Sequence, residues 1–286
     1  MNNQYQPPKV WTFDSKIGGK WAQVNRPISG ATHAADLPKG KHPLQLYSMA
    51  TPNGQKVAIM LEELLAAGKK AEYDAFLIDI GKGEQFSSGF VDINPNSKIP
   101  ALIDESEGIS IFESASILLY LAEKFDLFLS KETQLRVKTM NWLFWLHGSA
   151  PYLGGGFGHF YFYAPDKLEY PINRFTMEIK RQLDVLDKHL TNNRYLGGSE
   201  YSIADIATWP WYGNLVLGNL YNAGDFLSVD AYPNLIRWAK EVFERPAVQR
   251  GRIVNRVSGE EWELLSERHD ASDIDNRFII KDRLAK

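Results

Sequence analysis

The chain has 286 residues, of which 44% are hydrophobic and 13% aromatic, and its formal net charge is -3. This length supports two domains with a substantial core, and the slightly acidic balance gives no electrostatic reason to expect nucleic acid or an anionic membrane as a partner. The chain contains no cysteine, which excludes disulfides, thiolate metal sites and a protein thiol nucleophile, so any sulfur chemistry must come from a ligand or substrate.

The first 43 residues form a polar extension that is rich in Gly, Pro and Lys. Its aromatic residues, Trp11, Phe13 and Trp21, favour packing of part of the extension on the body of the protein over a disordered tail. Residues 1–43 are therefore expected to be an N-terminal extension with some ordered structure.

Residues 44–127 alternate between strand-like and helix-like patterns. Strands are expected at residues 44–47, 72–78, 101–104 and 109–112, and helices at 55–67 and from 114 to about 125. The order β-α-β followed by β-β-α is typical of a thioredoxin-like α/β domain. In that arrangement a helical crossover makes the first two strands parallel, and the last two strands form an antiparallel hairpin.

Residues 131–255 have a helical period throughout, which predicts an all-helical second domain. In its clearest helix, apolar residues recur every three or four positions from Phe175 to Leu190. The remaining residues, 256–286, are charged and weakly periodic. They predict a C-terminal tail with one short helix near Trp262.

A capping signal lies inside the helical half. Ser202 and Asp205 have the spacing of a capping box, and Tyr201 and Ile206 fall at the hydrophobic staple positions on either side. The expected role of this motif is to begin a helix and not to perform chemistry.

Three short segments at thioredoxin-like spacing carry a family resemblance: Thr51–Gln55, Ser97–Pro100 and Phe112–Ser114. Together with the helical half and its capping box, they resemble the cytosolic glutathione transferase family over about residues 44–254. The resemblance implies a thioredoxin-like glutathione-binding domain followed by an all-helical transferase domain.

Four segments resemble the bacterial nu-class transferases more narrowly: the region of Asn25, Thr51–Lys56, Glu84–Phe90 and Gly154–His159. Members of that class have glutathione-dependent disulfide reductase activity. They hold two glutathione molecules, or glutathione disulfide, in each active site. The resemblance therefore implies one or two glutathiones per site in a homodimer.

Ile99–Pro100 precedes the strand expected at residues 101–104. A proline at a strand start is tolerated at a sheet edge. The functional interpretation is a cis-proline that turns the N–H and C=O groups of Ile99 toward the ligand backbone. We prefer it in this context, although cis bonds occur at only a few percent of X-Pro positions. Lys98 either pairs with a ligand carboxylate or is an ordinary solvated lysine.

Glu113–Ser114 marks the start of the helix that follows the hairpin. Ser114 alone would satisfy the helix as an N-cap. The free N–H groups and the dipole at this end also bind carboxylates, here that of the γ-glutamyl group, while Glu113 pairs with the ammonium group. Because an acid directly before a cap is otherwise hard to justify, we favour ligand binding.

Thr51–Pro52–Asn53 lies where glutathione transferases position the group that activates the thiol. A helix N-terminus lowers the pKa of a thiol, and hydroxyl and amide donors stabilise the thiolate. Thr51 followed by Pro52 is also an ordinary helix start, and both roles are compatible. We assign Thr51 and Asn53 as catalytic and Pro52 to binding. Tyr47 ranks lower because it lies inside a strand.

The resemblance implies four further ligand contacts. Gln85 and Asn25 would bind the glutathione backbone. Arg174 would pair bidentately with a carboxylate of a second glutathione, the alternative being a solvated arginine. His147 stands where the nu-class pattern has glutamine, so it is either a donor to a second ligand or a buried structural histidine.

Two other groups of residues have open roles. The glycine-rich, aromatic segment at residues 152–163 either walls an apolar acceptor pocket or provides packing or a dimer contact. The basic residues Arg250, Arg252 and Arg256 favour a solvated face over a nucleic-acid patch, given the acidic balance of the chain.

The preferred function is glutathione-dependent disulfide reduction. The thiolate of bound glutathione would attack a disulfide, and a second glutathione would resolve the mixed disulfide. The alternatives are conjugation of electrophiles or reduction of hydroperoxides by the same thiolate, and a non-catalytic glutathione-binding module. No metal, nucleic acid or membrane is expected as a partner.

A cytoplasmic location is the expectation from the termini and the hydropathy. The sequence lacks an apolar run of the roughly 18 residues that span a membrane. Residues 1–8 lack the basic head and apolar stretch of a secretory signal.

Overall fold

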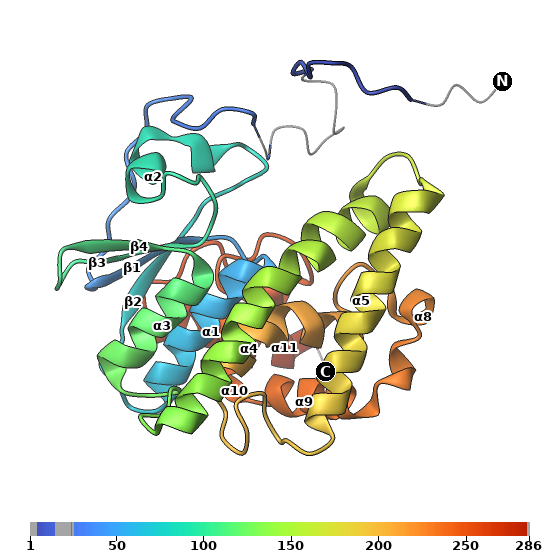
Figure 1. The fold of residues 1–286 in the computed structure, drawn as a ribbon. Helices are drawn as coiled ribbons and strands as arrows, with labels where there is room; N and C mark the ends of the chain where they lie inside the picture. Colours follow the sequence, from blue (N-terminus) through green and yellow to red (C-terminus); the bar gives the residue numbers. More distant parts are fainter. Residues whose placement is uncertain (1–4, 15–23, 25, 285–286) are drawn as a thin grey trace.

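The computed structural model describes residues 5–14, 24 and 26–284. A mixed four-stranded sheet with helices forms the first half, and helices form the second half (Figure 1), which confirms the predicted thioredoxin-like and all-helical halves. The elements of the first half are β1 (Leu44–Ser48), α1 (Pro52–Ala66), β2 (Tyr73–Leu77), α2 (Ser88–Ile93), β3 (Ala101–Asp104), β4 (Ile109–Phe112) and α3 (Ser114–Phe125).

The sheet has the strand order β2-β1-β3-β4. β1 and β2 are parallel, with Leu44 opposite Tyr73, because α1 carries the chain across the sheet between them. β3 pairs antiparallel with β1 and with β4, which confirms the predicted hairpin. The glycine- and serine-rich stretch before the hairpin contains α2, which the sequence did not predict. Ser87 caps this short helix, and Phe90 is its buried residue.

α1 is buried along most of its length because it packs against α3 and against α10 (Pro246–Gly251) of the helical half. Thr51 is its N-cap and Pro52 occupies the first turn, as the sequence predicts. Apolar side chains such as Leu61 and Leu64 are fully buried, and each stabilises the fold by about 1.5–3 kcal/mol. This burial fixes the N-terminus of α1, where the candidate site lies.

The helical half begins with the long helix α4 (Thr133–Pro151), which continues into a π-helical segment, η3 (Tyr152–Tyr163), and is followed by α5 (Glu169–Leu190) (Figure 1). The remaining elements are α6 (Ile203–Thr208), the π-helical η4 (Trp209–Gly213), α7 (Asn214–Val216), α8 (Gly224–Leu227), α9 (Pro233–Phe243), α10, and the 3-10 turns η2 (Glu84–Phe86), η5 (Val229–Ala231) and η6 (Glu261–Glu263).

The predicted capping box is present at the start of α6. Ser202 Oγ accepts a hydrogen bond from Ala204 N at 3.3 Å, and Asp205 Oδ2 accepts one from Ser202 N at 3.0 Å. Asp205 is fully buried and also accepts from Leu196 N and Trp238 Nε1. The motif therefore joins α6 to the loop before it and to α9, beyond its role in capping.

Part of the N-terminal extension packs on the body of the protein, as predicted. Residues 26–43 lie along the first half: Thr32 N donates to Phe86 O at 2.9 Å, and Tyr47 Oη donates to Pro38 O at 2.7 Å. This packing does not come from Trp11 and Phe13, which are more than half exposed. Trp21 lies outside the described residues.

The C-terminal segment is not the tail that its charge pattern predicts. It forms η6 and a further helix, α11 (Ala271–Leu284). Between them Arg268 is fully buried, stacks on Tyr73 and makes an antiparallel bridge with Ala75 of β2. A charged residue can be buried in this way because Glu62 and Glu72 lie within ion-pair distance.

The arginines of residues 250–256 do not form a solvated face, so that expectation is wrong. Arg250 pairs with the buried Glu62 at 2.8 Å, while Arg252 and Arg256 share Glu263 at 2.7 and 3.1 Å. Sequence periodicity could not show these pairs because their acids come from other segments of the chain.

Candidate active site

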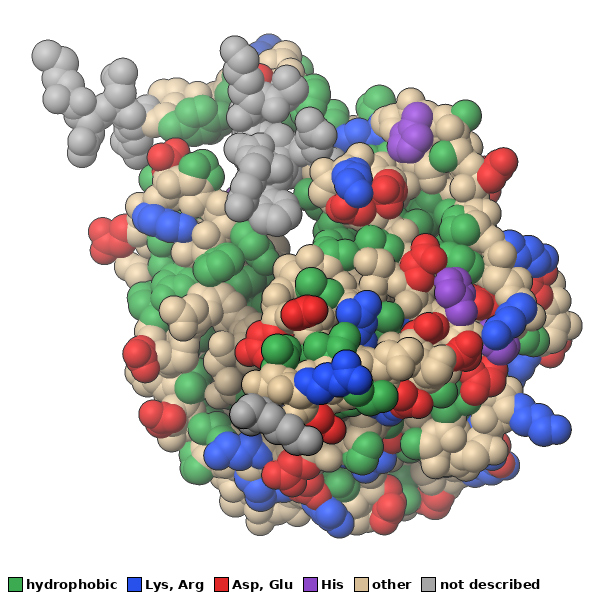
Figure 2. Space-filling view, turned by 180° about the vertical axis from the view of Figure 1, so that it is seen from behind, with side chains coloured by type: hydrophobic (Ala, Val, Ile, Leu, Met, Phe, Trp, Pro, Cys, Tyr) green, Lys and Arg blue, Asp and Glu red, His purple; other side chains and the backbone are tan. Residues whose placement is uncertain are grey.

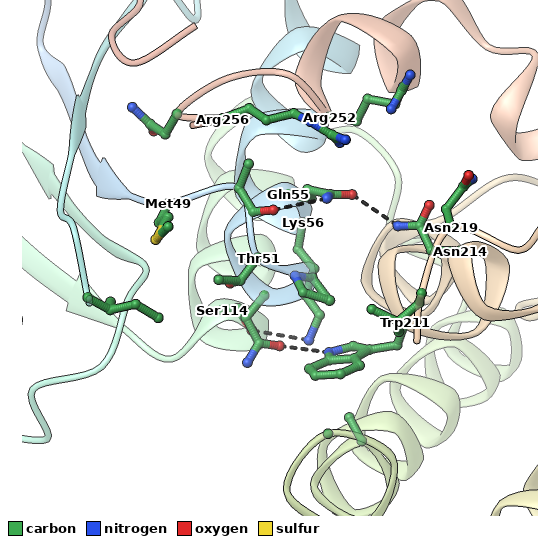
Figure 3. A pocket seen from close by; sticks show the side chains of 18 of the residues that line it. Met49, Thr51, Gln55, Lys56, Ser114, Trp211, Asn214, Asn219, Arg252 and Arg256 are labelled. Atoms are coloured by element: carbon green, nitrogen blue, oxygen red, sulfur yellow. Dashed lines mark hydrogen bonds between the residues drawn. The ribbon is translucent and has the colours of Figure 1, made fainter. Parts of the chain in front are cut away.

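A cavity of about 1160 Å³ lies between the two halves at the N-terminus of α1. Its walls come from α1, the loop after β2, the start of α3, α4, η3 and η4, and residues 252–263. The predicted residues that line it are Thr51, Pro52, Asn53, Glu113, Ser114 and His147. Thr51 and Ser114 are labelled in Figure 3.

A smaller cavity of about 280 Å³ adjoins the first and shares Thr51, Asn53, Glu113 and Ser114 with it. Three more predicted residues, Gln85, Lys98 and Ile99, line this part. The two cavities together bring residues that are far apart in the sequence into one continuous groove of a size that suits a small peptide.

Thr51 caps α1, and its hydroxyl proton has no acceptor among the residues that the structure describes. Its Oγ1 accepts a hydrogen bond from Gly54 N at 3.4 Å as the N-cap of α1. A hydroxyl has one donor besides its acceptor lone pairs, and here it faces the cavity. The side chain can therefore donate to an anion in the cavity while it caps the helix.

Asn53 is oriented by a tryptophan from the other half. Trp211 of η4 donates from Nε1 to Asn53 Oδ1 at 2.9 Å (Figure 3). Because the amide oxygen faces the indole, the amide nitrogen must point the other way. Among the residues that the structure describes, that nitrogen has no hydrogen-bond partner, so its two N–H groups are available to a ligand.

A second amide in the first turn of α1 is held in the same manner. Gln55 donates from Nε2 to Ala50 O at 3.1 Å and accepts at Oε1 from Asn214 Nδ2 at 3.2 Å. The helical half thus fixes two amides of the first half. The sequence did not predict Trp211 or Asn214 as site residues, since Trp211 lies 158 positions from Asn53.

Glu113 and Ser114 form the start of α3 at the edge of the cavity. Glu113 has a φ of 67°, a backbone conformation that is uncommon outside glycine and that occurs often at functional sites. Its carboxylate is about half exposed and lies 3.9 Å from His147 Nε2, while Ser114 is buried. Glu113 Oε1 also accepts from Asn96 Nδ2 at 3.5 Å, so a carboxylate with only two long contacts in the described part of the chain lies beside the N–H groups at the start of a helix.

The Ile99–Pro100 peptide bond is cis, as the functional interpretation requires. Nearby, Gln85 is buried and its Oε1 has no hydrogen-bond partner among the described residues. A buried acceptor of this kind is costly unless a ligand N–H satisfies it. Lys98 donates from Nζ to Val24 O at 3.1 Å, and burial lowers its pKa.

Not every predicted residue reaches the groove. Arg174 lines a separate cavity of about 510 Å³ with Trp145 and Tyr152, between α4, η3 and α5. Asn25 lies outside the described residues. Tyr47 donates to Pro38 O inside the core, where burial raises its pKa to about 12, so it is unsuited to thiol activation. His147 is exposed, which contradicts the buried structural alternative.

The glycine-rich segment forms part of the cavity wall, together with Thr51 and Asn53. Gly154 and Gly155 of η3 line it, together with Tyr163 and Trp211. A Cβ at Gly154 would lie 2.5 Å from the ring of Trp211, so any side chain there would displace the indole that orients Asn53. At Gly155 a Cβ would meet no atom within 4 Å, and a larger residue would project into open space.

Two further features, a metal site and a membrane-spanning helix, are absent from the part of the chain that the structure describes. No cluster of three or more His, Asp or Glu residues there has the arrangement of a metal site. Nor is any described helix both long and apolar enough to cross a membrane. Charged side chains of both signs are interspersed over the face shown in Figure 2.

Comparisons with known proteins agree with this geometry. Residues 42–123 match the glutathione S-transferase N-terminal domain, and residues 169–241 match the C-terminal domain. The disulfide-bond oxidoreductase YghU of Escherichia coli is 65% identical over 277 residues, which are 96% of each chain.

Two solved structures are also similar. Glutathione transferase YghU from Streptococcus pneumoniae, complexed with glutathione, has a TM-score of 0.86 at 56% identity, covering 90% of this chain and 100% of that chain. A glutathione transferase from Pseudomonas putida, with one glutathione disulfide bound per subunit, has a TM-score of 0.68 at 42% identity, covering 74% and 92%.

Proposed function

The chain belongs to the glutathione S-transferase family, and we propose that it is a glutathione-dependent disulfide-bond oxidoreductase that takes both reacting thiols from its ligands. The proposal rests mainly on one observation: the Thr51 hydroxyl and the oriented amide of Asn53 lie together at the N-terminus of α1. Both donors face the cavity, and the chain has no cysteine of its own.

In the first step, the glutathione thiolate attacks one sulfur of the substrate disulfide. A glutathione–substrate mixed disulfide forms, the original S–S bond breaks, and the other half leaves as a thiolate that takes up a proton. In the second step, another glutathione thiolate attacks the glutathione sulfur of the mixed disulfide. Glutathione disulfide forms and the second substrate thiol is released. Two glutathiones are oxidised for each disulfide reduced.

Thr51 and Asn53 act in both steps by stabilising a thiolate. A hydroxyl and an amide donor that already point into the cavity favour the charged sulfur over the neutral thiol, and the N-terminus of α1 adds its dipole. Hydrogen bonds to charged groups contribute about 1.5–3 kcal/mol each, which is enough to ionise the thiol near neutral pH.

The remaining predicted contacts hold the peptide. The N–H groups at the start of α3 and Ser114 bind the glutamyl carboxylate, and Glu113 binds the ammonium group. Gln85 Oε1 accepts a backbone N–H of the ligand, the backbone of Ile99 pairs with the cysteinyl unit, and Lys98 pairs with a carboxylate. Pro52 packs against the ligand.

For the second glutathione we assign His147, which is exposed on the cavity wall next to Glu113. Arg174 can join this role only if the second ligand reaches the cavity between α4 and α5. Asn25 is assigned to the first glutathione by family resemblance alone.

A comparison of substrates tests the reaction type. We expect the catalytic efficiency with a glutathione mixed disulfide to exceed that with a chloroarene and with an organic hydroperoxide, because the mechanism needs only a sulfur leaving group. The three assays are run in parallel at the same glutathione concentration. If the disulfide is the poorest substrate, the proposal fails. If glutathione does not bind at millimolar concentration, the non-catalytic alternative gains support.

We also propose a homodimer. Apolar side chains that face solvent follow one side of α4, with Val137 52% and Phe144 64% exposed, and continue to Tyr152 and Met177. Exposed apolar patches of this kind favour association. Phe144→Glu should therefore shift the sedimentation coefficient at micromolar concentration from dimer to monomer. Ile279→Glu, at a similarly exposed position of α11, should leave it unchanged, and a monomeric wild type would contradict the proposal.

We propose a cytoplasmic location. The mechanism consumes two reduced glutathiones in each cycle, and the cytoplasm keeps glutathione reduced. The absence of cysteine from the chain fits a compartment in which disulfides do not stabilise proteins.

A further inference from the structure

Lys56 is a buried cation without an anionic partner in the described part of the chain. It follows Gln55 on α1 and is 3% exposed. Its Nζ donates to Ser114 Oγ at 3.3 Å, and both side chains line the cavity (Figure 3). An ammonium group has three donors, and the neutral hydroxyl of Ser114 accepts one of them.

Several other buried charges in the described part of the chain have a partner of opposite charge. Asp104 is fully buried and accepts from Lys124, and Glu63 is buried against Arg245. A buried charge without such a partner is unfavourable, and burial accordingly lowers the pKa of Lys56 to about 7, with Glu113 acting in the opposite direction. The described part of the protein therefore supplies no anion to pair with Lys56, and a bound ligand can supply one.

We propose that Lys56 is the cation that neutralises the α-carboxylate of bound glutathione, which completes an ion pair missing from the free protein. The inference rests on the proposed function, because that carboxylate is placed at Ser114 by the glutathione-binding assignment. Ser114 Oγ lies at the N-terminus of α3 and touches Lys56 Nζ. A carboxylate bound to the N–H groups of this helix end is therefore next to the ammonium group.

In this arrangement the protein places one negative and one positive charge beside the amino-acid end of the ligand. Glu113 faces the ammonium group of glutathione, and Lys56 faces its α-carboxylate. Compounds that lack either group should lose affinity, so Lys56 contributes to selection of the γ-glutamyl unit over other acyl groups.

The ion pair also predicts proton uptake. In the free protein, Lys56 is only partly charged at pH 7. The α-carboxylate of the bound ligand would raise the pKa of Lys56. Below that pH the lysine is already charged and affinity is constant. Above pH 7, binding of each ligand is coupled to uptake of a proton by Lys56. The affinity therefore falls by up to about tenfold per pH unit, until the pH reaches the pKa of Lys56 in the complex.

Other charged groups share the cavity and must be separated from this effect. Glu113 and His147 lie at the same end, and Asp79 lies on the loop after β2. At the other end, Arg252 and Arg256 are paired with Glu263, and Glu260 accepts from Trp262 Nε1. His147 is the group most easily confused with Lys56, because it contacts Glu113.

Isothermal titration calorimetry of the full-length protein with S-methylglutathione tests the proposal, since this probe keeps both carboxylates but has no thiol to ionise. Titrations at pH 7 in phosphate and in Tris give the number of protons taken up. We expect a substantial fraction of a proton for the wild type and for His147→Gln. For Lys56→Met we expect none, with Kd raised about tenfold or more at pH 6.5.

A second probe keeps the test valid if Lys56→Met folds poorly. The analogue with a 4-aminobutanoyl group in place of γ-glutamyl lacks only the α-carboxylate, and it should bind wild type without proton uptake. Equal uptake with both probes, or unchanged affinity and uptake in a folded Lys56→Met variant, would overturn the role of Lys56. Absence of any binding of S-methylglutathione or glutathione to wild type would instead overturn the proposed function.

Discussion

Replacing Asn53 with Ala should lower kcat/KM for a glutathione mixed disulfide by about 10- to 100-fold, because one hydrogen bond to the thiolate is lost. The side chain is not part of the helix cap, but its removal leaves Trp211 Nε1 without its acceptor, which should cost about 1 kcal/mol of stability. Thr51→Val should have an effect of similar size on activity, and it should also cost about 1 kcal/mol of stability because the cap is removed. Steady-state kinetics and thermal unfolding separate the two contributions.

Thr51→Ser provides the matched control, since it keeps the hydroxyl that both the cap and the thiolate use. It should retain most of the wild-type activity. If Asn53→Ala and Thr51→Val both turn over at the wild-type rate, neither residue activates the thiol, and the catalytic assignment must be abandoned.

The orientation of Asn53 can be tested in the same series. Trp211→Phe keeps an aromatic, though smaller, side chain and removes the N–H that holds Asn53 Oδ1, so the amide is free to rotate and activity should fall less than in Asn53→Ala. Trp209→Phe is the control, because it removes another buried indole hydrogen bond, to Ala239 O at 2.9 Å, away from the site. Equal activity losses in the two variants would point to general destabilisation.

The second large effect concerns stability. Asp205→Ala should lower the free energy of unfolding by about 3–5 kcal/mol, because it leaves several buried donors without an acceptor. The carboxylate accepts from Leu196 N at 2.9 Å, from Ser202 N and Oγ at 3.0 Å each, and from Trp238 Nε1 at 2.8 Å. Urea-induced unfolding, followed by tryptophan fluorescence, measures the change.

An exposed aspartate serves as the control for that measurement. Asp184 pairs with Lys188 on the surface of α5 at 2.7 Å, with 49% of its side chain exposed. Asp184→Ala should change the free energy of unfolding by less than about 0.5 kcal/mol. A loss below about 1 kcal/mol in Asp205→Ala would show that α6 is not held by this network.

Features that depend on neighbours in the sequence were predictable. The cap at Thr51–Pro52, the hairpin of β3 and β4 and the capping box at Ser202–Asp205 each require only a few adjacent residues, and the structure confirms all three. Local chemistry also places Glu113–Ser114 at a helix start. The thioredoxin-like order of strands follows from these elements and the handedness of the crossover.

Features that depend on distant contacts were not predictable from one sequence. Asn53 looks like an ordinary first-turn residue until Trp211 is placed against it. Lys56 looks like a solvated lysine because its burial results from packing between the two halves. Likewise, Arg268 appears in a charged tail, and only the pairing of that segment with β2 shows that it is buried.

The ionisation of bound glutathione tests the central claim most directly. Thiolate absorbance, titrated against pH with saturating glutathione, gives the pKa of the bound thiol. In the wild type we expect it at least about one unit below that of free glutathione, and Asn53→Ala should raise it by about one unit. A bound thiol that titrates like free glutathione in the wild type would contradict thiolate stabilisation by Thr51 and Asn53.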